Sequence, residues 1–377
     1  EERPLPILTD KVLVTESLPL PITKAGTKVF TLDKLVNSSI STLQHRELKV
    51  EFTPNPAWYA VQALPYLMEF PHECAEQTFS RYYANRLATH IVEQRPAVKK
   101  VFAEWSSPLP GSGAGGEIAF LAALEKNTEL KGIVLEETPW LINAKDEGER
   151  KRRVALFFDL QRMASEEKTS LKKLRDMQLY NGSWPWWSGM GPSRYITQHI
   201  VAGFGHLEVL KAADTRGDGP NEQMVRRAVE WLDAEVDREH QEFVRRTKVE
   251  DRPKYVPSSM DVHLLYARSL FPRLPIDGAT RTAIGFLKER CKETWPQHGL
   301  QEQAMLVLAF DRMGDKVTAQ LILKSLGERA TRSEELGMYW KGFNAGYEWW
   351  GLPTETHALL VEAFHEVGKD EASTDLL

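Results

Sequence analysis

The sequence predicts an all-α fold of helical hairpins stacked around a centre, preceded by a short β-rich segment. From Pro56 onward, apolar residues recur with the spacing of amphipathic helices. Turns that contain glycine or proline interrupt this pattern every fifteen to thirty residues, roughly one helix length each. The first fifty or so residues carry short β-rich runs instead. We therefore expect residues 1–54 to belong to a flanking β-sandwich domain and residues 55–377 to form the helical domain.

Three N-terminal runs have the composition of strands: KVLVTES at 11–17, KVFTLDKL at 28–35 and ELKVEFT at 47–53. The last run alternates apolar and polar residues, which is the period of a half-buried strand. Three strands make a poor independent core, so we expect the remaining strands of the sandwich elsewhere in a longer polypeptide. The opening Glu-Glu-Arg-Pro, without an initiator methionine or a signal segment, also favours a piece of a longer chain.

The helical part contains several apolar faces with a period near 3.6 residues. The faces that define it most clearly are Phe79, Tyr82, Tyr83 and Leu87; Val225, Val229, Leu232 and Val236; and Leu360, Ala363, Phe364 and Val367. Loops near 108–116, 216–222 and 313–315 separate them, which indicates helix pairs. The polar run 237–254 is either an exposed helix extension or an ordered excursion, and we assign it no function.

Composition excludes several classes of function. The chain has 377 residues, 42% hydrophobic and 27% charged, as expected of a globular protein. No apolar run is long enough to span a bilayer. A net charge of −5 gives no basic surface for nucleic acid. The sequence has no HExxH, CxxC, P-loop or GxSxG pattern, so we expect no metal and no cofactor.

The most informative motif is Cys74-Ala75-Glu76-Gln77. If Cys74 lies in the turn before a helix that starts near Gln77, the two side chains can meet across one tight bend. The positive end of the helix dipole is expected to favour a thiolate there. Attack of the Cys74 sulfur on the Gln77 carboxamide would expel ammonia and leave an intramolecular thioester, which a hydroxyl or an amine could later open. The alternative is an inert core cysteine beside a helix start.

The sequence around this motif resembles the thioester region of bacterial alpha-macroglobulins, which are related to the complement thioester proteins. The resemblance covers residues 51–85 and continues in NGSWPWWSG at 181–189. It includes the segment 190–210, where a helix start carries proline, serine, an aromatic residue and threonine in that order, and it ends in GLPTETHALLVEAF at 351–364. A glutamine followed by Asn-Gly-Ser-Trp is also similar to the repeat turn of α/α-toroid proteins.

This resemblance implies an α/α toroid, in which an inner ring of helices is wrapped by an outer ring. It also implies a single-use covalent trap, not an enzyme. A lysine amine or a hydroxyl of an attacking protease would take the Gln77 acyl group, and Cys74 would leave as a thiol. The expected partners are target proteases and other domains of the parent polypeptide, with a periplasmic or cell-surface location.

A stored thioester must be kept from water. We expect aromatic side chains near the motif to do this, and we expect Glu76 either to face outward or to support the turn. The candidates for shielding are Tyr82, Trp184, Trp186, Trp187, Tyr339 and Trp340. Any one of them could instead simply pack the core.

Histidine is the other residue type that can take part in acyl transfer. The Asp-Val-His pattern that ends at His263 is similar to the family segment whose histidine forms an acyl-imidazole, so His263 is the candidate third member of the site. His199 is expected to bond its neighbours on a helix face.

Two other functions remain open on the sequence alone. One is an α/α-toroid carbohydrate-active enzyme, in which tryptophans stack on sugars and carboxylates such as Asp261 and Glu355 act as acid and base. The other is a structural or adhesive module in which the thioester never forms.

Overall fold

A computed structural model describes residues 14, 16–18, 20, 22, 26–46, 48, 50, 67, 73–94, 160–213, 219–333, 337–341 and 353–376. In this part of the chain the regular structure is almost entirely helical, which confirms the prediction of an all-α fold. The exception is a small antiparallel hairpin that the sequence did not predict. Its strands β1 (Thr331–Ser333) and β2 (Gly337–Tyr339) pair Arg332 with Met338.

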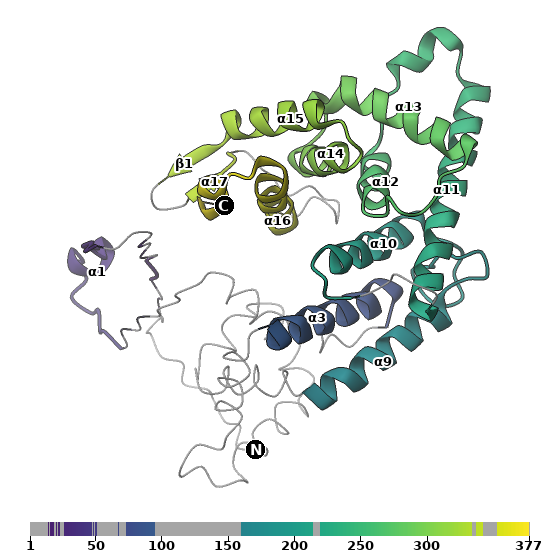
Figure 1. Ribbon diagram of the computed structural model, residues 1–377. Helices are drawn as coiled ribbons and strands as arrows, with labels where there is room; N and C mark the ends of the chain where they lie inside the picture. The colour runs from purple at the N-terminus through teal and green to yellow at the C-terminus, as the bar shows by residue number, and fades with distance from the viewer. Residues whose placement is uncertain are drawn as a thin grey trace, which may run out of the picture.

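The long helices form two curved rows (Figure 1). Neighbours in the inner row pack on each other in the order α3 (Ala75–Gln94), α10 (Arg194–Val209), α12 (Ser259–Ser269), α14 (Leu300–Arg312) and α16 (Pro353–Ala363). The outer row contains α9 (Leu160–Met177), α11 (Pro220–Arg246), α13 (Gly278–Thr294) and α15 (Lys316–Arg329). These pack on α3, α10, α12 and α14, respectively. From α9 to α15 the chain alternates between the rows, so each helical hairpin adds one helix to each.

The described residues also form shorter elements. They are α1 (Asp33–Val36), the 3-10 helices η1 (Val249–Lys254) and η2 (Trp295–Gln297), the π-helical turn η3 (Phe364–Gly368) and α17 (Glu371–Leu376). The first part of the polar run 237–254 is a helix extension, because α11 continues through Arg246, and the rest forms a short link and η1.

Side-chain caps determine where several of these helices begin. The Ser193 side chain accepts a hydrogen bond from the Ile196 backbone N–H at the start of α10, and Asp277 caps α13 in the same way. At α12, Ser258 and Asp261 form a reciprocal capping box. Each cap satisfies a backbone donor that the first helical turn leaves unpaired. The caps on α10 and α12 therefore fix the register at which these two inner helices present their side chains.

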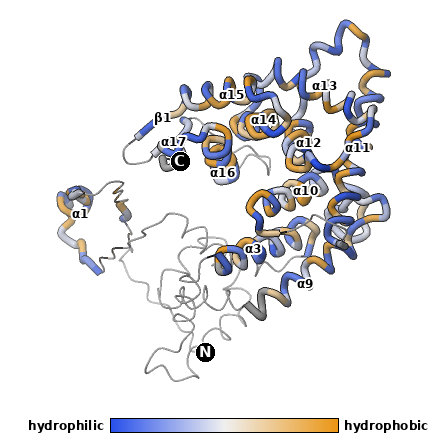
Figure 2. The backbone as a smooth tube through the Cα atoms, viewed as in Figure 1, coloured by the Kyte–Doolittle hydropathy of each residue, from blue (hydrophilic) through white to orange (hydrophobic). Residues whose placement is uncertain are grey.

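Hydrophobic residues concentrate on α10 and α14, which lie between other helices (Figure 2). Close packing in the inner row depends on glycine at one crossing. A Cβ built on Gly203 in α10 would lie 2.2 Å from the Phe79 ring of α3. Phe79 also packs against Phe204, with ring centroids 5.1 Å apart. Gly203 thus allows α3, which carries the Cys-Gln motif at its start, to lie directly against α10.

The tryptophan-rich turn before α10 is held by Gln178. Its side-chain amide donates to the Gly182 carbonyl and to the Met224 carbonyl of α11, both at 2.8 Å. Gly182 has φ +93°, a conformation that favours glycine, and any Cβ there would meet the Arg227 carbonyl at 2.3 Å. The turn residues that resemble a toroid repeat therefore tie the inner and outer rows together.

The N-terminal prediction needs correction. Within the run 28–35, which the sequence predicts as a strand, Asp33–Val36 forms the one-turn helix α1, closed by the Val36 N–H on the Leu32 carbonyl at 3.0 Å. The described residues of 14–50 contain no strand. Val29 and Val36 are exposed, so among the described residues nothing buries the apolar side chains that a strand here would present. Most of the runs 11–17 and 47–53 lies outside the described residues.

Candidate functional site

Cys74 and Gln77 meet at the beginning of α3. Cys74 directly precedes the first helical residue, Ala75, and its Sγ accepts a hydrogen bond from the Gln77 backbone N–H at 3.4 Å. Its carbonyl accepts the first helical bond, from Thr78 at 2.9 Å. This is the pattern of a helix cap, with sulfur where serine or threonine usually stands. Gln77 occupies the third helical position, from which a glutamine side chain can reach back to the cap residue. The spacing of the motif is therefore explained by capping geometry.

The Gln77 side chain has an unusual environment. Its Oε1 atom is buried and accepts no hydrogen bond from any residue that the structure describes. Leaving a buried acceptor unpaired costs about 1–3 kcal/mol, so such groups are uncommon and call for an explanation. In a thioester this same oxygen would be the acyl carbonyl oxygen, and its bond to carbon would be polarised by any donor that later reached it.

The expectation of an acidic thiol at Cys74 is wrong. Burial raises the pKa of Cys74 above its ordinary value, and the nearby Glu76 carboxylate adds to the increase. The Gln77 N–H opposes this shift, but it does not overcome it. The Cys74 side chain lies in the interior, and the desolvation of a thiolate outweighs the positive end of the helix dipole. Cys74 is therefore held as a neutral thiol at neutral pH.

Glu76 supports the turn in the expected way. Its Oε1 accepts from Ser80 Oγ at 2.9 Å, one helical turn further along α3. Its other oxygen, Oε2, lies 3.9 Å from Cys74 Sγ. The carboxylate also raises the pKa of Glu355 after the larger effect of burial, so Glu76 faces the same interior region as α16.

Trp186 contacts the motif directly. Its backbone carbonyl accepts from the Ala75 N–H at 3.0 Å, which joins the tryptophan turn to the start of α3. Its indole stacks on Tyr195 with ring centroids 5.8 Å apart. Among the shielding candidates, Trp186 is thus the one that hydrogen-bonds the motif within the described part of the structure.

The other shielding candidates lie in three kinds of environment. Trp184 and Trp340 are core residues whose indole N–H groups donate to the carbonyls of Leu174 and Leu326. Tyr82 is also buried, against Phe204. Tyr339 ends strand β2, and Trp187 is 44% exposed on the surface of the turn. Shielding by these five residues stays a prediction.

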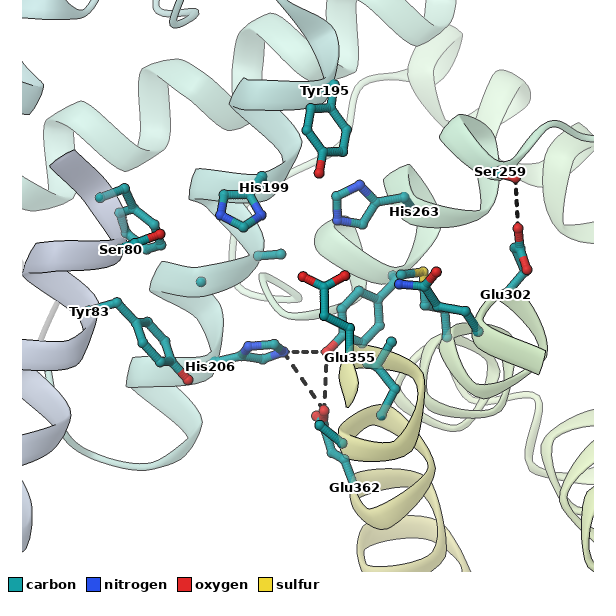
Figure 3. Close-up of a pocket in the computed structure, with 18 of the residues that line it drawn as sticks. Ser80, Tyr83, Tyr195, His199, His206, Ser259, His263, Glu302, Glu355 and Glu362 are labelled. Carbon is teal, nitrogen blue, oxygen red and sulfur yellow. Dashed lines mark hydrogen bonds and ion pairs between the residues drawn. The ribbon is translucent and has the colours of Figure 1, made fainter. Parts of the chain in front are cut away.

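A cavity of about 450 Å³ opens on the concave side of the inner row (Figure 3). All the inner helices contribute to it. The residues that carry its chemistry are Ser80 and Tyr83 of α3, Tyr195, His199 and His206 of α10, His263 and Tyr266 of α12, and Glu355 and Glu362 of α16. Figure 3 shows Glu355 pointing into the space beside His199 and His263. The cavity therefore gathers imidazoles, phenols and carboxylates between apolar walls.

The cavity histidines are held neutral. Burial, followed by the neighbouring histidines and Arg194, lowers the pKa of His263 to about 3. Burial also lowers the pKa of His199 and His206, although Glu76 and Glu362 act in the opposite direction. His206 hydrogen-bonds the Tyr266 hydroxyl, which in turn donates to Glu362 at 3.2 Å. A neutral imidazole has one protonated and one unprotonated ring nitrogen, so it can act as a proton donor or as a proton acceptor in this cavity.

His263 is connected to the Cys-Gln motif through aromatic rings. Its ring lies 6.3 Å from that of Tyr195, which stacks on Trp186, whose carbonyl binds Ala75. His263 is the fifth residue of α12, which begins at Ser259. A role in acyl transfer stays a prediction.

Sequence reasoning missed much of the cavity. It treated His199 as a residue that bonds its helix neighbours, and it gave no role to Tyr195, His206 or Gln198. A signal for three of these was present, because Tyr195, His199 and His206 recur at a spacing close to 3.6 residues and so share one face of α10. Which face of α10 meets α3 and α12 could not be deduced from that spacing.

Asp261, a carboxylate of the alternative enzyme hypothesis, is occupied by hydrogen bonds at the start of α12. Its Oδ2 accepts from the Ser258 N–H, the Ser258 hydroxyl and the Tyr255 hydroxyl, and its Oδ1 accepts from Arg194 at 2.9 Å. Burial acts against ionisation, but Arg194 and the Ser258 donors hold the pKa of Asp261 below its usual value. Glu355 does line the cavity, and burial raises its pKa.

Neither Cys74 nor Cys291 forms a disulfide, and Cys291 is buried in α13 with its pKa raised to about 12 by burial. Within the described ranges, no group of three histidine, cysteine or acidic side chains is arranged to hold a metal ion. The described helices also include none with the length and apolar character needed to cross a membrane. A scan of protein families gave no match to this sequence, and neither did a search of curated proteins.

Proposed function

We propose that this chain is the thioester-containing domain of a bacterial alpha-macroglobulin, and that it traps attacking proteases covalently. The observation that carries this proposal is the pairing of Cys74 Sγ with the Gln77 backbone N–H at 3.4 Å, beside a buried Gln77 side-chain oxygen that has no partner among the described residues. The resemblance of residues 51–85, 181–210 and 351–364 to that family supports it.

The proposed chemistry has two steps, the formation of the thioester and its later opening by the target protease. Cys74 Sγ bonds to Gln77 Cδ, the carboxamide nitrogen leaves as ammonia, and the thiol proton goes with it. Later, a lysine amine of the protease attacks Cδ. The C–S bond breaks, an amide forms, and Cys74 takes a proton to become a thiol. A hydroxyl acceptor would give an ester instead. The site acts once, so the protein is a trap and not a catalyst.

The two rows of helices favour the finer description of the fold as an α/α toroid. The chain alternates between an inner and an outer row, and the residues of the tryptophan turn tie them together. In this proposal the Cys-Gln motif lies at the start of an inner helix, and the aromatic residues around it exclude water. The parent polypeptide would be periplasmic or on the cell surface and would supply the flanking β-sandwich.

Methylamine labelling tests the proposed function. The native polypeptide that carries this sequence is incubated with methylamine, and incorporated label and released thiol are measured together. We expect one methylamine on Gln77 and one new thiol on Cys74. The Cys74→Ala variant and the Gln77→Glu variant, which has the side chain of a hydrolysed thioester, should take no label. Cys291→Ala is the matched control and should label fully. Absence of labelling in the wild-type polypeptide would reject the trap.

The α/α-toroid carbohydrate-active enzyme is less well supported by the geometry. It requires two available carboxylates, but Asp261 is a helix cap with four hydrogen-bond donors around it. It also leaves the unpaired Gln77 oxygen unexplained. Glycan hydrolysis by the Cys74→Ala variant would favour this alternative. A wild-type protein that takes no label and hydrolyses no glycan would favour the structural module.

A further inference from the structure

The orientation of one buried amide determines where the proton of His263 lies. Gln198 is fully buried on α10. Its Oε1 accepts from Arg194 Nε at 2.8 Å, and its Nε2 donates to the Met260 carbonyl at 3.1 Å. A guanidinium can only donate and a carbonyl can only accept. The amide therefore cannot be turned over without losing both bonds, and its NH₂ group stays on the side of α12.

The same NH₂ group faces His263. Gln198 Nε2 lies 3.3 Å from His263 Nδ1. One hydrogen of Nε2 goes to Met260, and the second points at the imidazole, so Nδ1 must be the acceptor. A neutral imidazole that accepts at Nδ1 carries its proton on Nε2. The ring is neutral here because burial holds the pKa of His263 far below its usual value.

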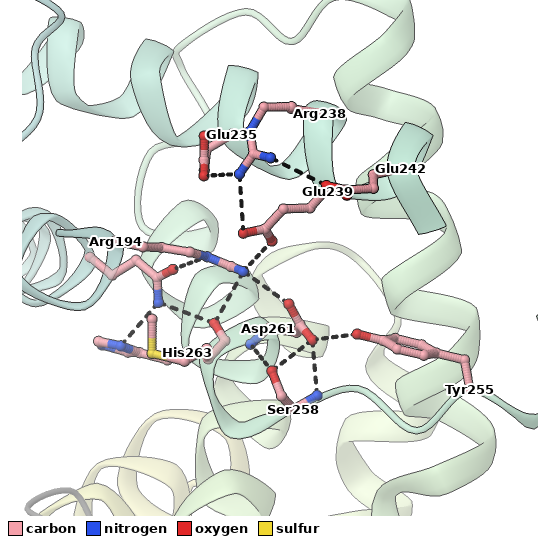
Figure 4. Close-up of polar contacts among 11 residues, drawn as sticks. Arg194, Glu235, Arg238, Glu239, Glu242, Tyr255, Ser258, Asp261 and His263 are labelled. Carbon is pink, nitrogen blue, oxygen red and sulfur yellow. Dashed lines mark hydrogen bonds and ion pairs between the residues drawn. The ribbon is translucent and has the colours of Figure 1, made fainter. Parts of the chain in front are cut away.

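Arg194 is itself held in place by acidic residues (Figure 4). Its guanidinium pairs with Asp261 at 2.9 Å and also with Glu239 of α11. Asp261 is in turn held by the Ser258 cap and by the Tyr255 hydroxyl, which donates to it at 2.8 Å. The positioning network, which we define as Arg194, Gln198, Asp261 and His263, is thus anchored to three helices.

We propose that Gln198 is a positioning residue that holds His263 in the Nε2–H tautomer, so that His263 offers the cavity an N–H donor and no free lone pair. The consequence for acyl transfer rests on the proposed function. An imidazole whose Nδ1 is occupied and whose Nε2 carries a proton cannot attack the Gln77 acyl carbon to form an acyl-imidazole. The acyl group then stays on Cys74 until an external nucleophile reaches it. Amines, which attack without a base, are therefore favoured over hydroxyls.

The tautomer can be measured without any thioester. Ring-nitrogen NMR of protein labelled with ¹⁵N-histidine distinguishes a protonated nitrogen from one with a lone pair, and the His263→Gln variant assigns the signals. We expect Nε2 to be protonated and Nδ1 unprotonated at neutral pH in the wild type. In Gln198→Glu, the carboxylate would accept from Nδ1–H, so the proton should move to Nδ1. A wild-type proton on Nδ1, or no change in Gln198→Glu, would overturn the proposal.

A competition between an amine and a hydroxyl acceptor then tests the predicted preference for amines. The native polypeptide is offered methylamine and glycerol together, and the ratio of ester to amide is measured. We expect Gln198→Glu to raise this ratio by about tenfold or more, within the range of general-base effects. The gain should disappear in Gln198→Glu/His263→Gln. Gln198→Met, which removes the amide without adding an acceptor, is the control for packing and should not produce the gain. A wild type that takes no methylamine refutes the proposed function, but the NMR result still decides the role of Gln198.

Discussion

The start of α3 and the positioning network differ in how their polar groups are bonded. Among Cys74, Gln77 and the four network residues, only His263 lines the cavity, to which α3 contributes Phe79, Ser80 and Tyr83. In the network, the side chains of Arg194, Gln198 and Asp261 are held by bonds of 2.8–3.1 Å, some within one helix or its cap and some between α10 and α12. At the start of α3, the Gln77 carbonyl oxygen is buried without a described partner, and the Cys74 thiol has only weak sulfur contacts. The comparison indicates that the network contributes stability and orientation, whereas the polar side chains of the motif are less firmly bonded.

The largest expected effect comes from breaking the network. Arg194→Met leaves Asp261 buried beside Glu239 without its cation, and removing one partner of a buried pair costs about 3–5 kcal/mol. Urea unfolding gives the free energy of unfolding. The control is Arg238→Met on α11, whose side chain is 57% exposed and whose ion pairs should contribute less than about 1 kcal/mol. Equal losses of unfolding free energy in Arg194→Met and Arg238→Met would contradict the assignment of stability to the network.

The packing of α3 on α10 should show the second largest effect. In Gly203→Ala the new methyl group would enter the Phe79 ring, and overpacking of this kind costs about 1–3 kcal/mol. Gly285→Ala in α13 is the matched control, because open space surrounds that glycine and alanine improves helix propensity by up to about 1 kcal/mol. The midpoint temperature of thermal unfolding should therefore fall in Gly203→Ala and rise in Gly285→Ala. A neutral Gly203→Ala would show that α3 can shift without cost.

The pH dependence of stability should reveal the buried neutral histidine. His263 has a folded-state pKa of about 3, below that of a histidine in the unfolded chain. Its stabilisation is complete above the unfolded pKa and is lost as the pH falls from about 6.5 toward 3. The unfolding free energy of the wild type should therefore fall more steeply than that of His263→Gln, by about 1 kcal/mol per pH unit in this window. Parallel curves would mean that His263 is protonated in the folded protein.

The smallest effect on stability is expected at the motif itself. Gln77→Met replaces the unpaired carbonyl with an apolar group of similar size, so the free energy of unfolding should change by less than about 1 kcal/mol or increase slightly. Chemical denaturation in parallel with Arg194→Met makes the comparison direct. If both substitutions cost several kcal/mol, the motif is as firmly bonded as the network and the contrast between them fails.

Much of the fold follows from local sequence signals. Apolar spacing predicted the helices around Phe79, Val229 and Leu360, and the structure contains α3, α11 and α16 there. The Cys-Gln spacing placed the motif at a helix start for a physical reason, the capping geometry. The one-turn helix α1 contradicted the strand predicted from the composition of the run 28–35, because β-rich composition favours a strand only where a sheet can bury it.

The site was less predictable because it depends on contacts between distant segments. Gln198 and His263 are 65 positions apart, and their bond exists only because α10 packs on α12. The pKa of Cys74 was predicted in the wrong direction because the helix dipole is visible in the sequence but burial is not. Both cases involve desolvation or amide orientation, which follow from tertiary packing and not from residue spacing.

The most direct test of the proposed thioester is the intact mass of the native polypeptide, denatured at neutral pH before any nucleophile is added. A Cys74–Gln77 thioester predicts a mass ~17 Da below the sequence value, because one ammonia has been lost. It also predicts that only Cys291 reacts with a thiol reagent in the denatured chain. A mass equal to the sequence value, with both Cys74 and Cys291 reactive, would contradict the account.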